Sequence, residues 1–276
     1  MGEPFSLLMS VYAGDDPDFL TAAFRSVVHQ QSRPPDDVVL VQDGLVGHEL
    51  GVTIKRLVEE SPAPARLVEL PDNVGLGLAL DQGLATCAHD IVARMDADDI
   101  AVPHRFQVQI PLVEAGADLV GSALLEFASG PDDIVGKRVP PIDPAEIVAY
   151  ARFHQPFNHP TVVYRRSVVQ AVGGYSDLPL MEDYLLFAKM IATGIRVANV
   201  AEPLVLYRVG AGAYARRGGV ILLKSEWALQ RQLRMQGFTS RAQFLRNVVV
   251  RGGYRLFPVS VRRVAYRRIV ARRGER

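Results

Sequence analysis

The sequence predicts an α/β fold with a largely parallel sheet, flanked by helices and followed by a helical C-terminal region. Two observations predict this fold. Short apolar runs of strand length alternate with stretches of helical periodicity over the first half of the chain, and this alternation is typical of sheets built from strand–helix–strand units. The apolar runs also lack interspersed polar residues, which fits strands that are buried on both faces.

Up to residue 127 the expected elements are a strand at 5–11, a helix at 17–30, strands at 38–41 and 65–70, a helix at 76–88, a strand at 91–95, a helix at 103–115 and a strand at 118–127. Asp16 precedes the first helix and is its candidate N-cap. Apolar residues recur in that helix at intervals of three and four: Phe19, Leu20, Ala23, Phe24, Val27 and Val28. This spacing indicates one buried helix face.

Beyond residue 127 the expected elements are a Pro-, Gly- and Asp-rich surface loop at 130–144, a strand at 161–164, a helical segment ending near 173–174, and helices at 182–193, 219–235, 240–250 and 259–273. Ser240 and Gln243 fit a capping box, in which each side chain bonds to the other residue's backbone N–H. We therefore expect one α/β domain at 1–215 and a helical, Arg-rich region at 216–276.

Composition and charge argue against several classes of protein. The 276 residues carry 31 Lys and Arg against 30 Asp and Glu, and this balance does not favour a nucleic-acid binder. Cys87 is the single cysteine, so no intramolecular disulfide points to an oxidising compartment. No run of about 18 apolar residues predicts a spanning helix, and the N-terminus lacks a signal-peptide pattern. The expected location is therefore the cytoplasm.

The strongest candidate for a functional site is the acidic segment Asp96-Ala97-Asp98-Asp99. It follows the strand predicted at 91–95, and ligands of open α/β sheets bind at the C-terminal ends of strands. Carboxylates this close repel one another unless a cation or hydrogen-bond donors compensate them. Mg²⁺ is commonly held by one or two carboxylates together with substrate phosphates. The segment favours a metal–diphosphate site, and the alternative is an acidic turn that caps the next helix.

Polar residues and glycines also stand at the ends of neighbouring elements. Ser10-Val11-Tyr12 ends the first strand, Asp43-Gly44 ends the second, and Asn73-Val74-Gly75-Leu76-Gly77 opens the helix at 76–88. All three fall at the sheet edge expected for Asp96, and glycines let a ligand approach the backbone closely. Singly, these segments fit a turn or a helix cap. Together they predict one wall of a binding pocket.

The set of motifs resembles that of family 2 glycosyltransferases. The resemblance lies, in chain order, in Phe5–Tyr12, Val41–Gly44, Asn73–Gly77, Arg94–Asp99, Phe157–Pro160 and Met181–Tyr184. It covers roughly residues 5 to 250 and is greatest to bacterial exopolysaccharide and O-antigen transferases of the amylovoran-biosynthesis type. It implies the GT-A fold, a Rossmann-like nucleotide-binding architecture, with a donor half at about 1–127 and an acceptor half at about 128–215.

The resemblance also implies roles for individual residues. Those expected to bind the donor nucleotide are Ser10, Val11, Tyr12, Asp43, Asn73, Gly75, Asp96 and Ala97. Among them Asp43 would contact the base and Asp96 the ribose, while Asp98 would hold a divalent metal ion, Mn²⁺ or Mg²⁺. The residues expected near the acceptor or the donor sugar are Asp99, His159 and Glu182. Gln42 stands where the family usually has an acid, which bears on base preference and not on the fold.

Asp183 is the expected catalytic base. An inverting transfer needs one base, which takes the proton from the acceptor hydroxyl as it attacks the anomeric carbon, while the metal neutralises the leaving diphosphate. An unperturbed Asp has a pKa of about 3.9, so a useful base needs partial burial or a like charge nearby. Glu182 supplies that charge. The alternative for the pair is an acidic first turn of the helix at 182–193.

Two Arg-rich segments are expected to meet anions. Arg208, Arg216 and Arg217 flank a Gly-rich stretch. A mobile loop carrying them would close over the diphosphate and exclude water; a basic surface loop is the alternative.

The second segment is the C-terminal end. From Arg251 to the end, nine arginines are opposed only by Glu275. With an apolar stripe at helical spacing, they predict a basic amphipathic helix on an anionic membrane surface. The alternatives are a helix packed on the domain and a homodimer contact.

The expected activity is metal-dependent, inverting transfer of a sugar from a nucleotide-diphosphate sugar, UDP-linked by preference, to a glycan or lipid-linked saccharide at the inner face of the cell membrane. A sugar nucleotidyltransferase would carry a basic Gly-rich loop after the first strand, where this chain has Ala13-Gly14-Asp15-Asp16. An aspartyl phosphatase would have its nucleophile there. A non-catalytic nucleotide-sugar-binding protein stays open as an alternative, because it would need the pocket and the metal but no base.

Overall fold

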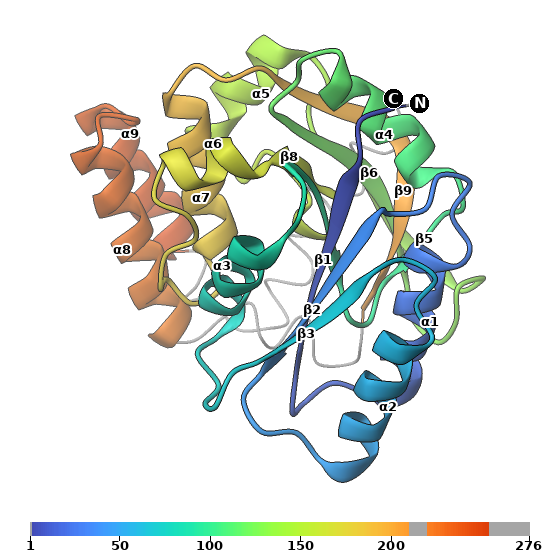
Figure 1. The fold of residues 1–276 in the computed structure, drawn as a ribbon. Coiled ribbons are helices and arrows are strands. Elements are labelled where there is room, and N and C mark those ends of the chain that lie inside the picture. Colours follow the sequence, from blue (N-terminus) through green and yellow to red (C-terminus); the bar gives the residue numbers. More distant parts are fainter. Residues whose placement is uncertain (1, 210–219, 254–276) are drawn as a thin grey trace.

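A computed structural model describes residues 2–209 and 220–253. Within these residues one curled sheet of nine strands lies between helices (Figure 1). The strand order is β3-β2-β1-β4-β8-β6-β9-β5, with β7 paired to β6 outside this path. The first four strands, β1 (Phe5–Tyr12), β2 (Asp37–Asp43), β3 (Ala65–Glu69) and β4 (Ile91–Asp96), pair in parallel. The expectation of a mixed, mainly parallel sheet is confirmed.

The parallel register brings the predicted motifs to one edge of the sheet. Tyr12 on β1 lies beside Asp43 on β2, and Ser10 on β1 lies beside Asp96 on β4. Because parallel strands end on the same side, these four residues share the edge at which ligands of α/β sheets bind.

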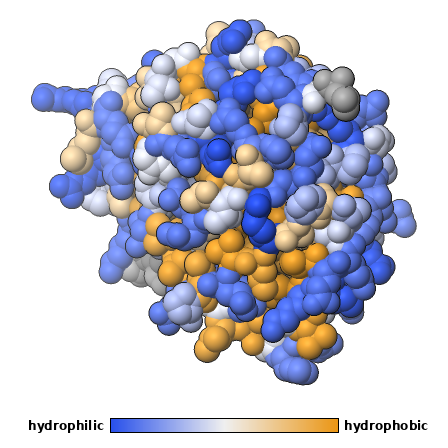
Figure 2. Space-filling view, viewed as in Figure 1, coloured by the Kyte–Doolittle hydropathy of each residue, from blue (hydrophilic) through white to orange (hydrophobic). Residues whose placement is uncertain are grey.

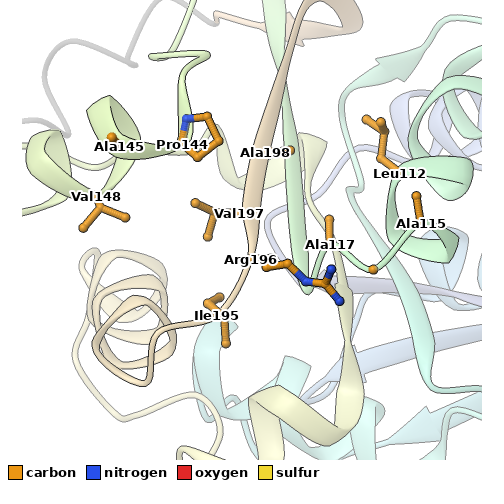
Figure 3. A pocket seen from close by; sticks show the side chains of 11 residues that line it. Leu112, Ala115, Ala117, Pro144, Ala145, Val148, Ile195, Arg196, Val197 and Ala198 are labelled. Carbon is orange, nitrogen blue, oxygen red and sulfur yellow. The ribbon is translucent and has the colours of Figure 1, made fainter.

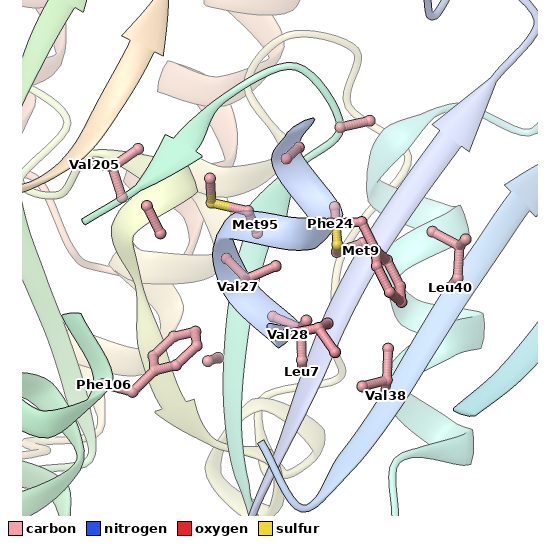
Figure 4. Packing of buried hydrophobic residues seen from close by; sticks show 14 of the residues in the cluster. Leu7, Met9, Phe24, Val27, Val28, Val38, Leu40, Met95, Phe106 and Val205 are labelled. Carbon is pink, nitrogen blue, oxygen red and sulfur yellow. The ribbon is translucent and has the colours of Figure 1, made fainter. Parts of the chain in front are cut away.

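Two hydrophobic cores lie on the two faces of this sheet. On one face Leu7 and Met9 of β1 pack with Phe24 of α1 (Pro17–Val28) and with α2 (His48–Glu59) and α4 (Arg105–Glu114) (Figure 4). On the other face Leu8 packs with α3 (Leu76–Thr86) and α7 (Glu182–Ala192). Side chains of β1 alternate between two apolar layers, which explains why its sequence is continuously apolar.

The second half of the sheet is mixed. β6 (Leu119–Phe127) runs parallel to β9 (Val197–Arg208) and antiparallel to β7 (Ile134–Arg138) and β8 (Val163–Arg165), and β5 (Ile100–Ala101) pairs antiparallel with β9. The remaining elements are α5 (Pro144–Ala151), the short turn η1 (His159–Thr161), α6 (Arg166–Ala171), α8 (Val220–Met235), α9 (Arg241–Asn247) and the π-helical turn η2 (Val248–Gly252). None of the helices in the described ranges is both long and apolar enough to cross a membrane.

Five helices and strands were not predicted, β5 and β7 among them, and one predicted loop is wrong in part. The stretch 130–144 contains β7, which an ion pair between Arg138 and Glu126 ties to β6, and it also contains the first residue of α5. Helices α2 and α5 and strand β9 were missed. In α2 the buried Leu50, Ile54 and Leu57 stand at helical spacing, and this signal would have revealed it.

Two predicted caps are confirmed. The Asp16 side chain accepts backbone N–H groups of Asp18 and Phe19 at the start of α1. Ser240 and Gln243 form the capping box of α9, with side-chain-to-backbone distances of 3.2 and 2.8 Å. The helix expected at 259–273 lies outside the described residues.

Candidate active site

Asp43 anchors the loop that opens α3. Its two carboxylate oxygens accept the backbone N–H groups of Val74 at 2.7 Å and Gly75 at 3.0 Å, and the Asn73 side chain donates to its carbonyl at 3.2 Å. Gly44, the next residue, has a φ of 83°, and a Cβ there would lie 2.6 Å from the backbone nitrogen of Asn73, so a side chain does not fit. The structure thus brings Asp43, Asn73 and Gly75 together, as expected.

The residues at the end of β1 divide between the surface and the core. Tyr12 is 45% exposed beside Asp43, whereas Val11 is buried in the hydrophobic core. Ala97 also packs in that core. Of Val11 and Ala97, therefore, only the backbone can reach a nucleotide.

Four carboxylates crowd the carboxyl end of β4. Asp96 pairs with Arg94. Burial and then the charge of Asp96 raise the pKa of Asp98 to about 6. Asp99 is fully buried, and one of its oxygens has no hydrogen-bond partner among the described residues. Asp15, for which no role was predicted, has its pKa raised to about 6 by burial, with Asp98 and Asp96 adding to the shift.

Arg208, at the end of β9, is fixed against this acidic end. Its backbone N–H donates to Asp99 at 2.8 Å, and its Nε donates to the Asp98 carbonyl at 2.9 Å. The guanidinium lies 3.7 Å from the ring centre of Phe19 and 4.5 Å from that of Phe127. Arg208 is thus held in place at the acidic cluster, while Arg216 and Arg217 lie outside the described residues.

The acidic cluster does not form a metal cage by itself. In the described part of the chain, no three His, Cys, Asp or Glu side chains converge closely enough to hold an ion. Burial, and then the neighbouring Asp carboxylates, raise the pKa of Asp15 and Asp98, so a bound cation would favour their ionised forms. This donor set fits Mg²⁺ or Mn²⁺ held by one or two carboxylates and completed by substrate phosphates.

Asp183 lies in the first turn of α7, where hydrogen-bond donors surround its carboxylate. Its Oδ1 accepts the Tyr184 backbone N–H at 2.6 Å, and its Oδ2 accepts the Gln155 side-chain amide. Nδ1 of His159 lies 3.7 Å from Oδ2. Burial raises the pKa of Asp183, and the Gln155 and Tyr184 donors oppose that rise. A partly buried carboxylate with a raised pKa is what a general base requires.

Glu182 is the first residue of α7 and packs against α3. It is buried against Gly77 of α3, where a Cβ would come within 2.9 Å of the Glu182 Cβ. Its Oε2 has no hydrogen-bond partner within the described ranges. Burial first, and then the charge of Asp183, raise the pKa of Glu182 to about 7.

Arg94 is the functional residue that sequence reasoning missed. Its position in the Arg94–Asp99 motif was the available signal, but no role followed from it. The side chain is fully buried, and its Nε and Nη1 have no hydrogen-bond partners among residues 2–209 and 220–253. Its charge lowers the pKa of Asp98, Glu182 and Asp183. Arg94 therefore acts electrostatically on carboxylates at the end of β4 and at the start of α7.

A shallow apolar pocket of about 510 Å³ lies away from these groups (Figure 3). It is lined by residues that include Leu112, Val148 and Val197. Val197 starts β9, whereas Arg208 at the other end of β9 contacts the acidic cluster. The pocket is thus not part of the candidate active site.

The buried Glu182 predicts a specific pH dependence of folding stability. Its pKa is about 7 in the folded protein and about 4.3 in an unfolded chain. Protonation of Glu182 stabilises the folded state fully below pH 4.3. This stabilisation is lost as the pH rises to 7, because the folded state keeps the proton to a higher pH than the unfolded chain does. In the parent protein the free energy of unfolding should therefore fall by roughly 3 kcal/mol over this range, and Glu182→Gln should remove this fall. Urea unfolding at pH 5 and pH 8 measures the free energy of unfolding of both proteins. The exposed Glu59→Gln is the control, and an unchanged pH dependence in Glu182→Gln contradicts the prediction.

Comparison with known proteins agrees with this geometry. The model of the family described as Glycosyl transferase family 2 matches residues 6–173. An uncharacterized glycosyltransferase of Haemophilus influenzae is 40% identical over 95% of this chain and 97% of its own length. The amylovoran biosynthesis glycosyltransferase AmsE of Erwinia amylovora is 36% identical over 95% and 97%. An Escherichia coli UDP-Gal:alpha-D-GlcNAc-diphosphoundecaprenol beta-1,3-galactosyltransferase is 34% identical over 97% of both chains.

Solved structures share the fold at low sequence identity. TarS of S. aureus, residues 1–349 in complex with UDP-GlcNAc, has a TM-score of 0.68 at 16% identity and covers 96% of this chain and 75% of its own. The mannosyltransferase PcManGT of Pyrobaculum calidifontis, in complex with GDP-Man and Mn²⁺, has a TM-score of 0.63 at 16% identity over 98% and 76%. The fold is therefore GT-A, and with the extended sequence matches it follows that this chain belongs to glycosyl transferase family 2.

Proposed function

We propose that this glycosyltransferase moves a sugar from a UDP-sugar to a lipid-linked saccharide, with inversion at the anomeric carbon and with a divalent metal ion. The observation that carries the proposal is the position of Asp183, a partly buried carboxylate with a raised pKa, across Arg94 from the acidic end of β4. The Escherichia coli relative, named for UDP-Gal and a diphosphoundecaprenol-linked sugar, and the UDP-GlcNAc complex of TarS support the donor and acceptor classes.

On the donor side, the loop anchored by Asp43 and the exposed ring of Tyr12 would hold the base, and Asp96 the ribose. Asp98 would hold the metal ion, which when bound would neutralise the leaving diphosphate. Arg208 lies at the same end of β4, where its guanidinium meets the Asp98 carbonyl and would face the diphosphate. The donor thus sits along the ends of β1, β2 and β4.

On the acceptor side, Asp183 takes the proton of the acceptor hydroxyl as its oxygen attacks the anomeric carbon. The bond from that carbon to the diphosphate oxygen breaks on the opposite face, so the configuration inverts. Glu182 keeps its proton to about pH 7, and its unpartnered oxygen would meet a sugar hydroxyl. A metal ion at Asp98 would neutralise the charge of the leaving diphosphate, so no protein acid would be needed for it.

Replacement of the base should stop turnover but not donor binding. Asp183→Asn keeps the shape of the side chain and removes the proton acceptor, so turnover should fall by about 10²–10⁴-fold while UDP-sugar affinity stays the same. A radiolabelled transfer assay and calorimetry measure the two quantities. The exposed Asp177→Asn is the matched control and should keep its turnover. Retention of the donor's anomeric configuration in the NMR spectrum of the product would exclude the single-displacement mechanism.

Metal dependence should reside in Asp98. UDP should bind the parent protein more tightly with Mn²⁺ or Mg²⁺ than with a chelator, because Asp98 would hold the ion and the ion would neutralise the diphosphate. Asp98→Ala should remove this difference and remain folded, whereas the exposed loop variant Asp132→Ala should keep it. Calorimetry checks all three proteins. Equal UDP affinity of the parent with and without metal would defeat the metal proposal.

The C-terminal helices support a membrane surface as the place of reaction. Residues 220–253 contain one acid, Glu226, and six cations: Lys224, Arg231, Arg234, Arg241, Arg246 and Arg251. Glu226 is buried and bonded to Arg251 at 2.6 and 3.0 Å. Large apolar side chains are exposed among the cations: Trp227, Leu245, Val249 and Val250. Exposed cations mixed with Trp and aliphatic residues are typical of surfaces that bind anionic lipids.

These helices also contact the segment that holds the base. The Asn247 side chain donates to the Arg152 carbonyl at 2.8 Å, and Arg251 donates to the Phe153 carbonyl at 3.0 Å. Gln155, two residues further on, bonds Asp183. Figure 1 shows α8 and α9 packed beside α7, and Figure 2 shows mainly hydrophilic residues on that side of the molecule. Membrane contact through α8 and α9 would bring Asp183 towards a lipid-linked acceptor.

Vesicle sedimentation tests the membrane proposal. The full chain should pellet with anionic vesicles, less so at high salt because salt screens the cations, and should stay in solution with neutral vesicles. A chain that ends at Gly253 lacks eight of the nine C-terminal arginines, keeps the pair of Arg251 with Glu226 and should bind less. The double variant Trp227→Ser, Leu245→Ser should weaken binding of the full chain. If neither change alters sedimentation, these segments do not bind the membrane, and light scattering then tests the homodimer alternative.

A further inference from the structure

We propose that Tyr175 is a positioning residue for the catalytic carboxylate: its hydroxyl donates to Nε2 of His159 and so keeps the ring proton on Nδ1, the nitrogen that faces Asp183. This inference rests on the proposed role of Asp183 as the base. Tyr175 lies in the connection between α6 and α7, and no role was expected for it.

The three side chains form a continuous buried line. Nε2 of His159 lies 2.9 Å from the Tyr175 hydroxyl, and Nδ1 lies 3.7 Å from Oδ2 of Asp183. His159 is 7% exposed and Tyr175 is 3% exposed. The Phe187 ring packs against the imidazole, with ring centres 5.9 Å apart. Packing holds the ring so that one nitrogen faces the tyrosine and the other faces the carboxylate.

The protonation state of His159 determines which ring nitrogen donates and which accepts in these contacts. Burial, together with the Arg94 guanidinium, lowers the pKa of His159 well below its usual value, so the ring is neutral at pH 7. A neutral imidazole has one N–H and one acceptor nitrogen, whereas an ionised carboxylate can only accept. The favourable arrangement therefore places the proton on Nδ1 towards Asp183 and leaves Nε2 to accept from Tyr175.

This arrangement favours the ionised form of Asp183. An N–H directed at a carboxylate stabilises its charge and lowers its pKa. The other groups that face Asp183 are the donors Gln155 and the Tyr184 N–H, the cation Arg94, and the acids Glu182 and Asp96. Removal of the Tyr175 hydroxyl leaves all of these in place. The Tyr175 hydroxyl also faces the buried hydroxyl of Tyr164, so Tyr164→Phe is measured beside Tyr175→Phe. A shift in the Asp183 titration that only Tyr175→Phe produces reports the orientation and tautomer of His159.

The experiment is the pH profile of kcat/KM for Tyr175→Phe. Because Glu182 titrates in the same range, the profile is measured in the parent and in the Glu182→Gln background. The acidic limb of the profile should shift to higher pH by about half a unit, so that kcat/KM at acidic pH falls about threefold. The affinity for UDP should stay unchanged. The control is Ser26→Ala in α1, which loses a buried hydrogen bond to the Ala23 carbonyl and should lower the Tm without moving the limb. An unmoved limb in Tyr175→Phe overturns the proposal.

A second measurement needs no active variant. Nitrogen-15 NMR of the imidazole groups, with His159 assigned through His159→Gln, shows which ring nitrogen carries the proton. A proton on Nδ1 at pH 7 supports the proposal, and a proton on Nε2 overturns it even if Tyr175→Phe does not fold. Failure of Asp183 as the base is detected separately, because Asp183→Asn would then keep its turnover.

Discussion

The carboxylates at the end of β4 and at the start of α7 both depend on one buried cation, the guanidinium of Arg94. A buried cation is stable only when it is paired, and carboxylates gathered at one edge of a sheet need positive charge nearby. Arg94 meets both conditions, because it pairs with Asp96 and lowers the pKa of Asp98, Glu182 and Asp183. It also disfavours a second positive charge on His159. One side chain on β4 thereby influences the protonation of carboxyl groups on two separate elements, the end of β4 and the start of α7.

This electrostatic arrangement has a cost in stability. Glu182 and Asp183 stand at the start of α7 with raised pKa values, and burial without full compensation opposes folding at neutral pH. Gly77 allows α3 to pack directly on Glu182, so the same contact that joins the two halves also excludes water from the carboxyl group. Such sites keep groups that are poorly solvated because chemistry needs their shifted pKa values.

The helical C-terminal region contacts the segment before Gln155 through hydrogen bonds to backbone carbonyls. Asn247 and Arg251 bond the carbonyls of Arg152 and Phe153, and the same connection continues to Gln155 at the base. The exposed cations and apolar residues of α8 and α9 are therefore mechanically linked to Asp183. The contacts of α9 and η2 with residues 152 and 153 thus lie two residues from the hydrogen bond that holds Asp183, the proposed base.

The sequence alone determined the parallel strands and the motifs at their ends, because continuous apolar runs and terminal Asp and Gly residues are local signals. It also determined the caps at Asp16 and Ser240, whose partners lie within three residues. Only the tertiary structure showed what surrounds Asp15, Arg94 and Tyr175. Each depends on a partner that is distant in the chain: Asp15 on Asp98, Tyr175 on His159, and Arg94 on Asp183. Charge interactions and buried hydrogen bonds act through space, so no periodicity or spacing along the chain reveals them.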